Sequence, residues 1–211
     1  MSSKVSQEIG CHTFSHIQVG DPECSRDCFA SELLACRLAA EEFGLELKSF
    51  VFPLQMVGHL DVLKEHGYIA YRGNLLQDPV RKPRIMRWLV YCLSAGPTVL
   101  PEEHNGLWDL PMCLSYPPPR YWTSTPAVRL QVWKSKRALR RAAEQRRLFH
   151  LCFHPFNLAA NPGRLFRGLE NIFTEFCRYR DSGLLDNLSM GQLAHALQFT
   201  KEQPASTDIS L

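Results

Sequence analysis

The chain has 211 residues, of which 45% are hydrophobic and 21% are charged, and its 24 basic and 21 acidic side chains leave a formal net charge of +3. This composition is typical of one soluble globular domain and excludes a largely disordered chain, while so small a net charge does not by itself indicate nucleic-acid binding. The longest apolar stretches, such as Trp88 to Leu93, are far shorter than the roughly 20 residues that cross a bilayer, and residues 1–8 lack the apolar core of a secretory signal, so we expect a cytoplasmic protein.

The N-terminal half alternates short strands with helices. In chain order we predict strands over Ser6 to Cys11, Leu47 to Pro53 and Tyr68 to Tyr71, and helices over Phe29 to Phe43, His59 to His66 and Pro83 to Ala95. Such an alternation with short connections indicates parallel β/α units. Each crossover is expected to be right-handed.

The C-terminal half begins with a proline-rich stretch. Pro97 to Pro126 holds seven of the fourteen prolines, which predicts a long surface loop with one short strand around Leu107 to Ser115. After it we predict helices over Ala127 to Arg147 and Arg164 to Arg180, a strand over Leu148 to Phe153 between them, and a last turn or two over Gly191 to Phe199. We therefore expect one α/β domain over residues 1–200 and a polar tail over 201–211.

Two pairs of histidines are separated by four residues, His12/His16 and His150/His154, which is more than eight histidines in 211 residues give by chance. Two imidazoles at this spacing can bind one metal ion, and zinc is the natural candidate. A catalytic zinc ion takes three protein ligands and leaves a fourth position for water. The alternative is that one of His12 and His16 caps a loop while the other is packed or solvated, and spacing alone does not decide between the two.

A strand over Leu148 to Phe153 would place His154 at its C-terminal end, because Pro155 prevents further pairing. Barrel enzymes present catalytic side chains from this position, and an imidazole can carry a proton near neutral pH. The alternative is an ordinary polar residue where a strand ends.

Other polar groups fit ordinary structural roles. No Cys-x-x-Cys pair occurs among the eight cysteines, so we read them as reduced thiols, with a metal site at Cys24 and Cys28 as an alternative. The helix from Arg129 to Arg147 carries eight basic residues and one acid. We interpret it as an outer helix with a solvated basic face rather than a nucleic-acid or membrane surface.

The ordered combination of four segments resembles the polysaccharide deacetylases of the NodB-homology type, over roughly residues 7 to 160. The segments are His12-Thr13-Phe14-Ser15-His16, Ser49 to Pro53, His59 to Tyr68, and Leu151 to Pro155. The resemblance implies a distorted (β/α) barrel with a metal ion, usually zinc, held by two histidines and one aspartate. His12 and His16 match the two histidine ligands. His154 matches the histidine that protonates the leaving amine when the family removes an acetyl group from an N-acetylated sugar.

The sequence departs from this family in two places. The family's Thr-Phe-Asp-Asp segment supplies the catalytic base and the third metal ligand, and the eleven residues before His12 contain no such segment. Leu54 and Gln55 stand where the family has an arginine or an aromatic-glycine pair, although Arg72 or Gln55 can partly substitute. We therefore expect an incomplete, N-terminally truncated (β/α) barrel that holds its metal weakly and has impaired activity.

The predicted function is that of a metal-dependent hydrolase that removes acetyl groups from an N-acetylated sugar or polysaccharide. One alternative is a non-catalytic sugar-binding or interaction protein in which Trp108, Tyr121 and Trp122 stack on sugar rings. A nucleic-acid-binding protein that uses the basic helix is disfavoured. We expect no nucleic-acid partner and no membrane span, and the sequence leaves the oligomeric state open.

Overall fold

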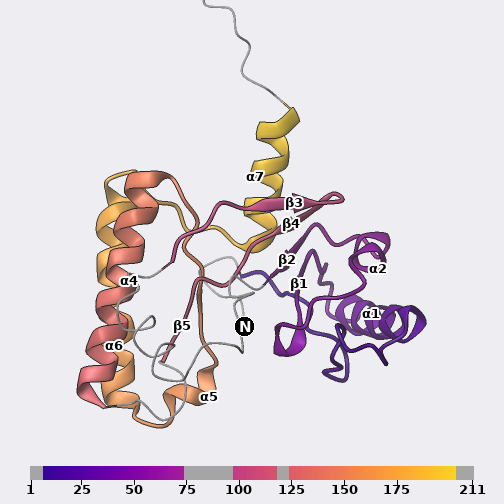
Figure 1. Ribbon diagram of the computed structural model, residues 1–211, viewed down its shortest axis with the longest axis horizontal. Helices are drawn as coiled ribbons and strands as arrows, with labels where there is room; N and C mark the ends of the chain where they lie inside the picture. Colours follow the sequence, from indigo (N-terminus) through magenta and orange to yellow (C-terminus); the bar gives the residue numbers. More distant parts are fainter. Residues whose placement is uncertain (1–6, 74–96, 118–123, 203–211) are drawn as a thin grey trace, which may run out of the picture. The chain divides into compact units, whose positions relative to one another are not determined.

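A computed structural model describes residues 7–73, 97–117 and 124–202, which form a mixed α/β structure with two small sheets (Figure 1). The chain divides into two compact units. The first consists of Met1–Gly73, Glu102–Leu110 and Leu188–Leu211, and the second of Asn74–Pro101 and Pro111–Asn187. The helix predicted over Pro83 to Ala95 lies outside the described residues. Of the helices in the described part of the chain, none combines the length and the apolar character that a membrane crossing requires.

The sheet of the first unit has four strands in the order β1-β2-β4-β3. The strands are β1 (Ser49–Val51), β2 (Ala70–Arg72), β3 (Glu102–His104) and β4 (Leu107–Asp109). The pairs β1/β2 and β2/β4 are parallel and β3/β4 is antiparallel, so the parallel arrangement predicted for the N-terminal half is confirmed. A closed barrel is not present in the described residues, and the incomplete (β/α) barrel and the single domain over residues 1–200 stay predictions.

The strand predicted over Ser6 to Cys11 is much shorter in the structure, since only Cys11 among its described residues pairs with the sheet. Its N–H donates to the Ser49 carbonyl at 2.8 Å, and its carbonyl accepts from the Val51 N–H at 2.9 Å. This parallel bridge places Cys11 beside β1. Among the described residues before it, Glu8 contributes side-chain hydrogen bonds instead of strand pairing.

The strand predicted over Leu107 to Ser115 is wrong in extent, because it is two separate strands. Pro111 has no N–H with which to continue pairing, and the second strand, β5 (Leu114–Ser115), belongs to the other unit. The sequence analysis also did not predict the hairpin formed by β3 and β4. β3 and β4 are joined by Asn105 and Gly106 with φ values of 54° and 84°, and an Asn-Gly pair favours this two-residue hairpin turn.

Three helices and a 3-10 turn complete the first unit: α1 (Arg26–Glu41), η1 (Pro53–Gln55), α2 (Leu60–Glu65) and α7 (Met190–Glu202). The N-cap of α1 is Ser25, whose hydroxyl accepts from the Cys28 N–H at 3.1 Å. The core of this unit is aromatic at its centre. Phe50 is 0% exposed, and its ring meets those of Phe29 and Phe52 edge-on at centroid distances of 5.5 and 4.7 Å.

The carboxylate of Glu8 connects the N-terminal segment to the start of α7. It accepts from the Gly191 N–H at 2.8 Å and from the Ser49 hydroxyl on β1. At the other end of α7, Lys201 pairs with Glu103 of β3. Residues 201 and 202, at the start of the predicted polar tail, continue the helix.

Glu8→Ala is expected to lower the free energy of unfolding of the first unit by about 1 to 3 kcal/mol, the range for losing hydrogen bonds to a charged group. Ser49 is 2% exposed and would lose its acceptor. The Gly191 amide would exchange faster with solvent hydrogen, which NMR can follow. Gln7→Ala is the control, because Gln7 is exposed; equal effects of the two substitutions would contradict the role given to Glu8.

The second unit pairs β5 in parallel with β6 (Leu151–Cys152). Its helices are α4 (Thr125–Gln145), α5 (Pro155–Leu158) and α6 (Pro162–Asp181), and α4 and α6 lie side by side (Figure 1). The core between them contains Tyr116, whose hydroxyl donates to the Leu165 carbonyl at 2.7 Å.

Packing in the second unit partly follows the predicted helical faces. The helical spacing of apolar residues in α6 predicts one buried face that contains Leu165, Ile172 and Phe173. Leu165 and Ile172 are buried as predicted, whereas Phe173 is 47% exposed. On α4, Trp133 is 43% exposed although its spacing predicts burial, and Lys134 is only 1% exposed. Of the basic residues predicted on this helix, Arg129, Arg137, Arg140, Arg146 and Arg147 are exposed, as a solvated basic face predicts, and Lys134 is the buried exception.

Candidate metal centre

His12 leaves the first unit's sheet at the edge formed by the carboxyl ends of its parallel strands. Cys11 pairs in parallel with Phe50, so the next residue, His12, lies beyond the last pairing at the end where β1 also finishes. In open α/β sheets this edge is where ligands bind. His12 thus directly follows Cys11, the last residue of the strand predicted over Ser6 to Cys11.

The rings of His12 and His16 lie together, with centroids 4.9 Å apart and an interplanar angle of 81°. Two imidazoles bound to one zinc ion at 2.0 to 2.1 Å and a tetrahedral angle have centroids roughly 5 Å apart. His12 is half-buried and His16 is exposed. The centroid distance is therefore compatible with two ligands of one ion, and their role as ligands stays a prediction.

A backbone carbonyl orients the first imidazole. Nδ1 of His12 lies 2.6 Å from the Val51 carbonyl oxygen, and since a carbonyl only accepts, Nδ1 carries the hydrogen. In neutral imidazole the lone pair then resides on Nε2. Metal-binding histidines commonly hold their second nitrogen in this way, which fixes both the tautomer and the ring direction.

The loop between the two histidines is held by Glu32 of α1. Its carboxylate accepts from the N–H groups of Phe14 and Ser15 at 2.8 and 2.7 Å, and from the Ser15 hydroxyl at 2.7 Å. Thr13 and His16 both have φ values of 62°, a left-handed conformation that is unfavourable for residues other than glycine. Sequence reasoning missed Glu32, because only the folded chain brings α1 to this loop.

Burial alone would raise the pKa of the Glu32 carboxyl, but the hydrogen bonds from Ser15 and Phe14 outweigh it and hold that pKa below its ordinary value. Since the pKa is lower in the folded chain, the carboxylate's stabilisation of the loop is present above the ordinary pKa of glutamate and is lost as pH falls through the folded pKa.

We therefore expect the Ser15 amide resonance to shift with acid at a pH below the titration of an ordinary glutamate, in a titration followed by NMR. Glu32→Gln should remove this transition and leave the loop loosened at every pH, because an amide cannot accept all three hydrogen bonds equally well. Glu42→Gln, at the exposed end of α1, is the control and should leave the transition in place. An unchanged transition in Glu32→Gln would contradict this account.

A third ligand does not join the pair within the described residues, where no group of three His, Cys, Asp or Glu side chains is arranged to hold a metal ion. The loop nevertheless contains a polar atom that needs a partner. Thr13 Oγ1 is buried and has no hydrogen-bond partner in the described part of the chain. Buried hydroxyls are normally hydrogen-bonded, so this position favours an additional polar group beside His12.

Asp109 is a second polar group of the first unit that sequence reasoning missed, and it ends β4. Its carboxylate accepts from the Gly73 N–H at 2.9 Å. Burial raises the pKa of Asp109, against the lowering effect of hydrogen bonds from Gly73 and Tyr71. Burial, followed by the charge of Asp109, also raises the pKa of Tyr71. Burial thus favours the protonated form of both side chains in the Tyr71/Asp109 pair.

Leu54 and Gln55, which stand where the family has an arginine or an aromatic-glycine pair, follow β1, and Arg72, a possible substitute for that arginine, ends β2. Leu54 is 66% exposed, and Leu54 and Gln55 have φ values of 50° and 60° in the turn after β1. Arg72 is the last residue of β2 and is half-buried. The positions of Leu54, Gln55 and Arg72 give no evidence for a catalytic role of any of the three.

His154 belongs to the second unit and lies just beyond β6, as its sequence position predicts. It is the N-cap residue of α5, and Pro155 is the first residue of that helix. Its exposed imidazole stacks on Phe156 at a centroid distance of 5.1 Å and an interplanar angle of 19°. The structure thus brings His12 and His16 together within one unit, while the assignment of His154 as their catalytic partner stays a prediction.

The comparisons with known proteins assign no family to this arrangement. No protein-family model matches the sequence, and no curated protein matches it.

Proposed function

We propose that the chain is a metal-dependent hydrolase of the polysaccharide deacetylase type, which removes acetyl groups from N-acetylated sugars. One observation carries the proposal: the ring centroids of His12 and His16 are 4.9 Å apart. His12 lies at the carboxyl edge of a parallel sheet, and the Val51 carbonyl sets its tautomer. The order of the four sequence segments that resemble this family supports it.

Each residue of the centre has a defined task in this proposal. His12 and His16 bind the ion through imidazole nitrogen, and Glu32 keeps the loop between them in its left-handed conformation. A zinc ion held there supplies Lewis acidity toward an amide carbonyl and lowers the pKa of water. His154 is the proposed proton donor to the departing amine, since imidazole donates and accepts protons at neutral pH.

We expect the chain to bind its metal ion weakly. Two imidazoles are one ligand short of the usual catalytic zinc set, and the described residues add no third side chain. Zinc is therefore expected to exchange readily and to be lost to chelators. The non-catalytic alternative, in which the chain binds sugar without turnover, is an outcome of the following experiment.

The experiment measures acetate release from N-acetylglucosamine oligomers by the full chain with added Zn²⁺. We expect release that a chelator stops, and a loss of about 100- to 10,000-fold in His154→Ala, the usual effect of removing an acid-base group. His195→Ala, an exposed histidine on α7, should retain the wild-type rate. Oligomer binding without acetate release at saturating zinc would replace the hydrolase with a sugar-binding protein.

A further inference from the structure

The exposed side of α4 carries side chains that follow one another at helical spacing. Arg129, Trp133, Arg137, Arg140 and Glu144 are all exposed, and the intervals of three or four residues between them place them along one side of the helix. Arg140 pairs with Glu144 at 2.7 Å. The remaining three residues, Arg129, Trp133 and Arg137, are called the α4 row below.

Positive charge is concentrated on this part of the chain. Residues 125–147 hold eight of the 24 basic side chains and one of the 21 acidic ones, so the rest of the chain has more acidic than basic residues. Arg140 and Arg141 follow Arg137 at three and four residues, and like charges at these spacings destabilise a helix. A bound anion would relieve this repulsion, which solvent alone relieves only in part.

The aromatic member of the row is in contact with a cation. The Arg137 guanidinium lies over the Trp133 ring, 5.1 Å from its centroid, in a cation–π contact, while 43% of the tryptophan stays exposed. A guanidinium that stacks through its face can still donate hydrogen bonds in its plane. Arg129 lies four residues before Trp133, so each arginine is about 6 Å from the tryptophan along the helix axis.

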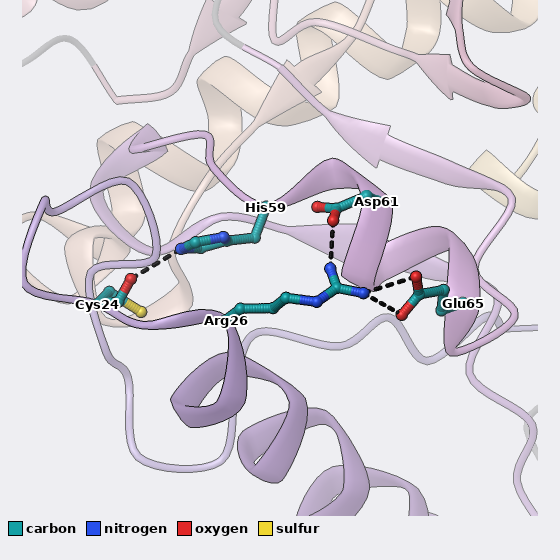
Figure 2. A network of polar contacts seen from close by, with 5 residues as sticks. All are labelled: Cys24, Arg26, His59, Asp61 and Glu65. Atoms are coloured by element: carbon teal, nitrogen blue, oxygen red, sulfur yellow. Dashed lines mark hydrogen bonds and ion pairs between the residues drawn. The ribbon is translucent and has the colours of Figure 1, made fainter.

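Arginines elsewhere in the described chain contact carboxylates. Nη2 of Arg26 contacts both carboxylate oxygens of Glu65 at 2.6 Å, and its other terminal nitrogen pairs with Asp61 (Figure 2). Within the part of the chain that the structure describes, neither Arg129 nor Arg137 has such a carboxylate partner. The α4 row therefore presents two guanidinium groups that can bind carboxylates of another molecule.

We propose that the α4 row binds an acidic polysaccharide, a polymer of N-acetylated sugars that also carries carboxylates. The proposal rests on the proposed function in taking the polymer to be a carbohydrate. Arg129 and Arg137 each bind a carboxylate through two parallel N–H groups. Trp133 stacks on the apolar face of the sugar ring between these carboxylates, since its indole offers a broad apolar surface.

Two other anionic partners fit the α4 row less well. A helix that lies on an anionic membrane buries a face of several large apolar side chains, whereas Trp133 is the only one in the row. Proteins that bind single-stranded nucleic acid stack successive bases on several aromatic rings, and the row again offers one. Both partners are tested as competitors in the experiment below.

The experiment measures binding by isothermal titration calorimetry, with the full-length chain in a chelator so that no metal contributes. The two probes are a hyaluronan hexasaccharide, in which N-acetylglucosamine alternates with a carboxylated sugar, and the uncharged N-acetylglucosamine hexamer. We expect the acidic hexasaccharide to bind about tenfold more tightly, the size of effect that two exposed ion pairs give. The difference should shrink as the salt concentration rises, because salt screens exposed charges.

Three variants test which residues are responsible. The double variant Arg129→Gln/Arg137→Gln should bind both hexasaccharides with the same affinity, and Trp133→Ala should weaken the binding of both. The control is Arg178→Gln/Arg180→Gln, which changes the net charge equally but removes arginines whose carboxylate partners lie on α6 itself; it should keep the preference. Circular dichroism shows whether each variant folds like the wild type.

Several outcomes would overturn the proposal. Equal affinity of the wild type for the two hexasaccharides would do so, as would an equal loss of preference in the α6 control. Tighter binding of a single-stranded DNA oligonucleotide or of phosphatidylserine vesicles would assign the α4 row to that partner instead. Because binding is measured without metal, a preference for the acidic hexasaccharide without acetate release would contradict the proposed hydrolase alone. Acetate release without that preference would contradict only the role given to the α4 row.

Discussion

His12→Ala is expected to abolish stoichiometric zinc binding by the purified chain, with an apparent affinity at least about 100-fold below that of the wild type, because one imidazole remains of an already incomplete ligand set. The same loss is expected for His16→Ala, whose ring lies 4.9 Å from that of His12. Zinc content after equilibrium dialysis against buffers of defined free Zn²⁺ concentration measures both.

Two controls separate ligation from general disturbance of the fold. His195→Ala removes an exposed imidazole from α7 of the same unit and should retain full zinc binding. His12→Gln keeps a polar side chain near the Val51 carbonyl, and it should fold like the wild type, as far-UV circular dichroism can show, yet still lose the metal. Zinc bound equally by the wild type and His12→Ala would contradict a metal site at this pair.

The largest effect on stability is expected from Phe50→Ala, which should reduce the free energy of unfolding of the first unit by about 3 to 5 kcal/mol. Phe50 is 0% exposed and sits at the centre of a ring cluster that includes Tyr68 at a centroid distance of 5.8 Å. Its removal leaves a cavity and also takes away the edge-on ring contacts. A loss of this size is a large fraction of the total stability of a small domain.

Hydrogen exchange at the Val51 amide reports on this unit specifically, since that N–H donates to the Cys11 carbonyl across the sheet. Urea unfolding followed by circular dichroism gives the corresponding change for the whole chain. Phe43→Ala, which removes the same ring from a position that is 76% exposed, should have little effect on either measurement. Similar losses for Phe43→Ala and Phe50→Ala would show that burial in this core is not what stabilises the unit.

Local signals in the sequence identified several elements because their causes are local. The helical spacing of apolar residues and the glycine after Phe43 predict α1 to within a few residues, and the β-branched and aromatic run around Phe50 predicts β1. Leu165 and Ile172 were correctly placed on the buried face of α6. In each case the side chains of one short segment contain the information.

The errors arose where a neighbouring segment decides the outcome. Phe173 and Trp133 have the spacing of buried residues but are 47% and 43% exposed. The strand predicted over Ser6 to Cys11 contributes only Cys11 among its described residues, because Glu8 uses its carboxylate to bind Ser49 and Gly191. The β3/β4 hairpin could have been predicted, since Asn105-Gly106 is a strong local turn signal.

By itself the sequence determined the histidine spacing, the helix and strand types near it, and the order of segments that resembles the deacetylases. Only the tertiary structure decided how that site is supported. The Val51 carbonyl lies 39 residues from His12 in sequence and sets its tautomer, and Glu32 lies 17 residues beyond Ser15 and holds the loop between the histidines. Hydrogen bonds between distant segments depend on how helices and strands pack, and no pattern within a single segment encodes that packing.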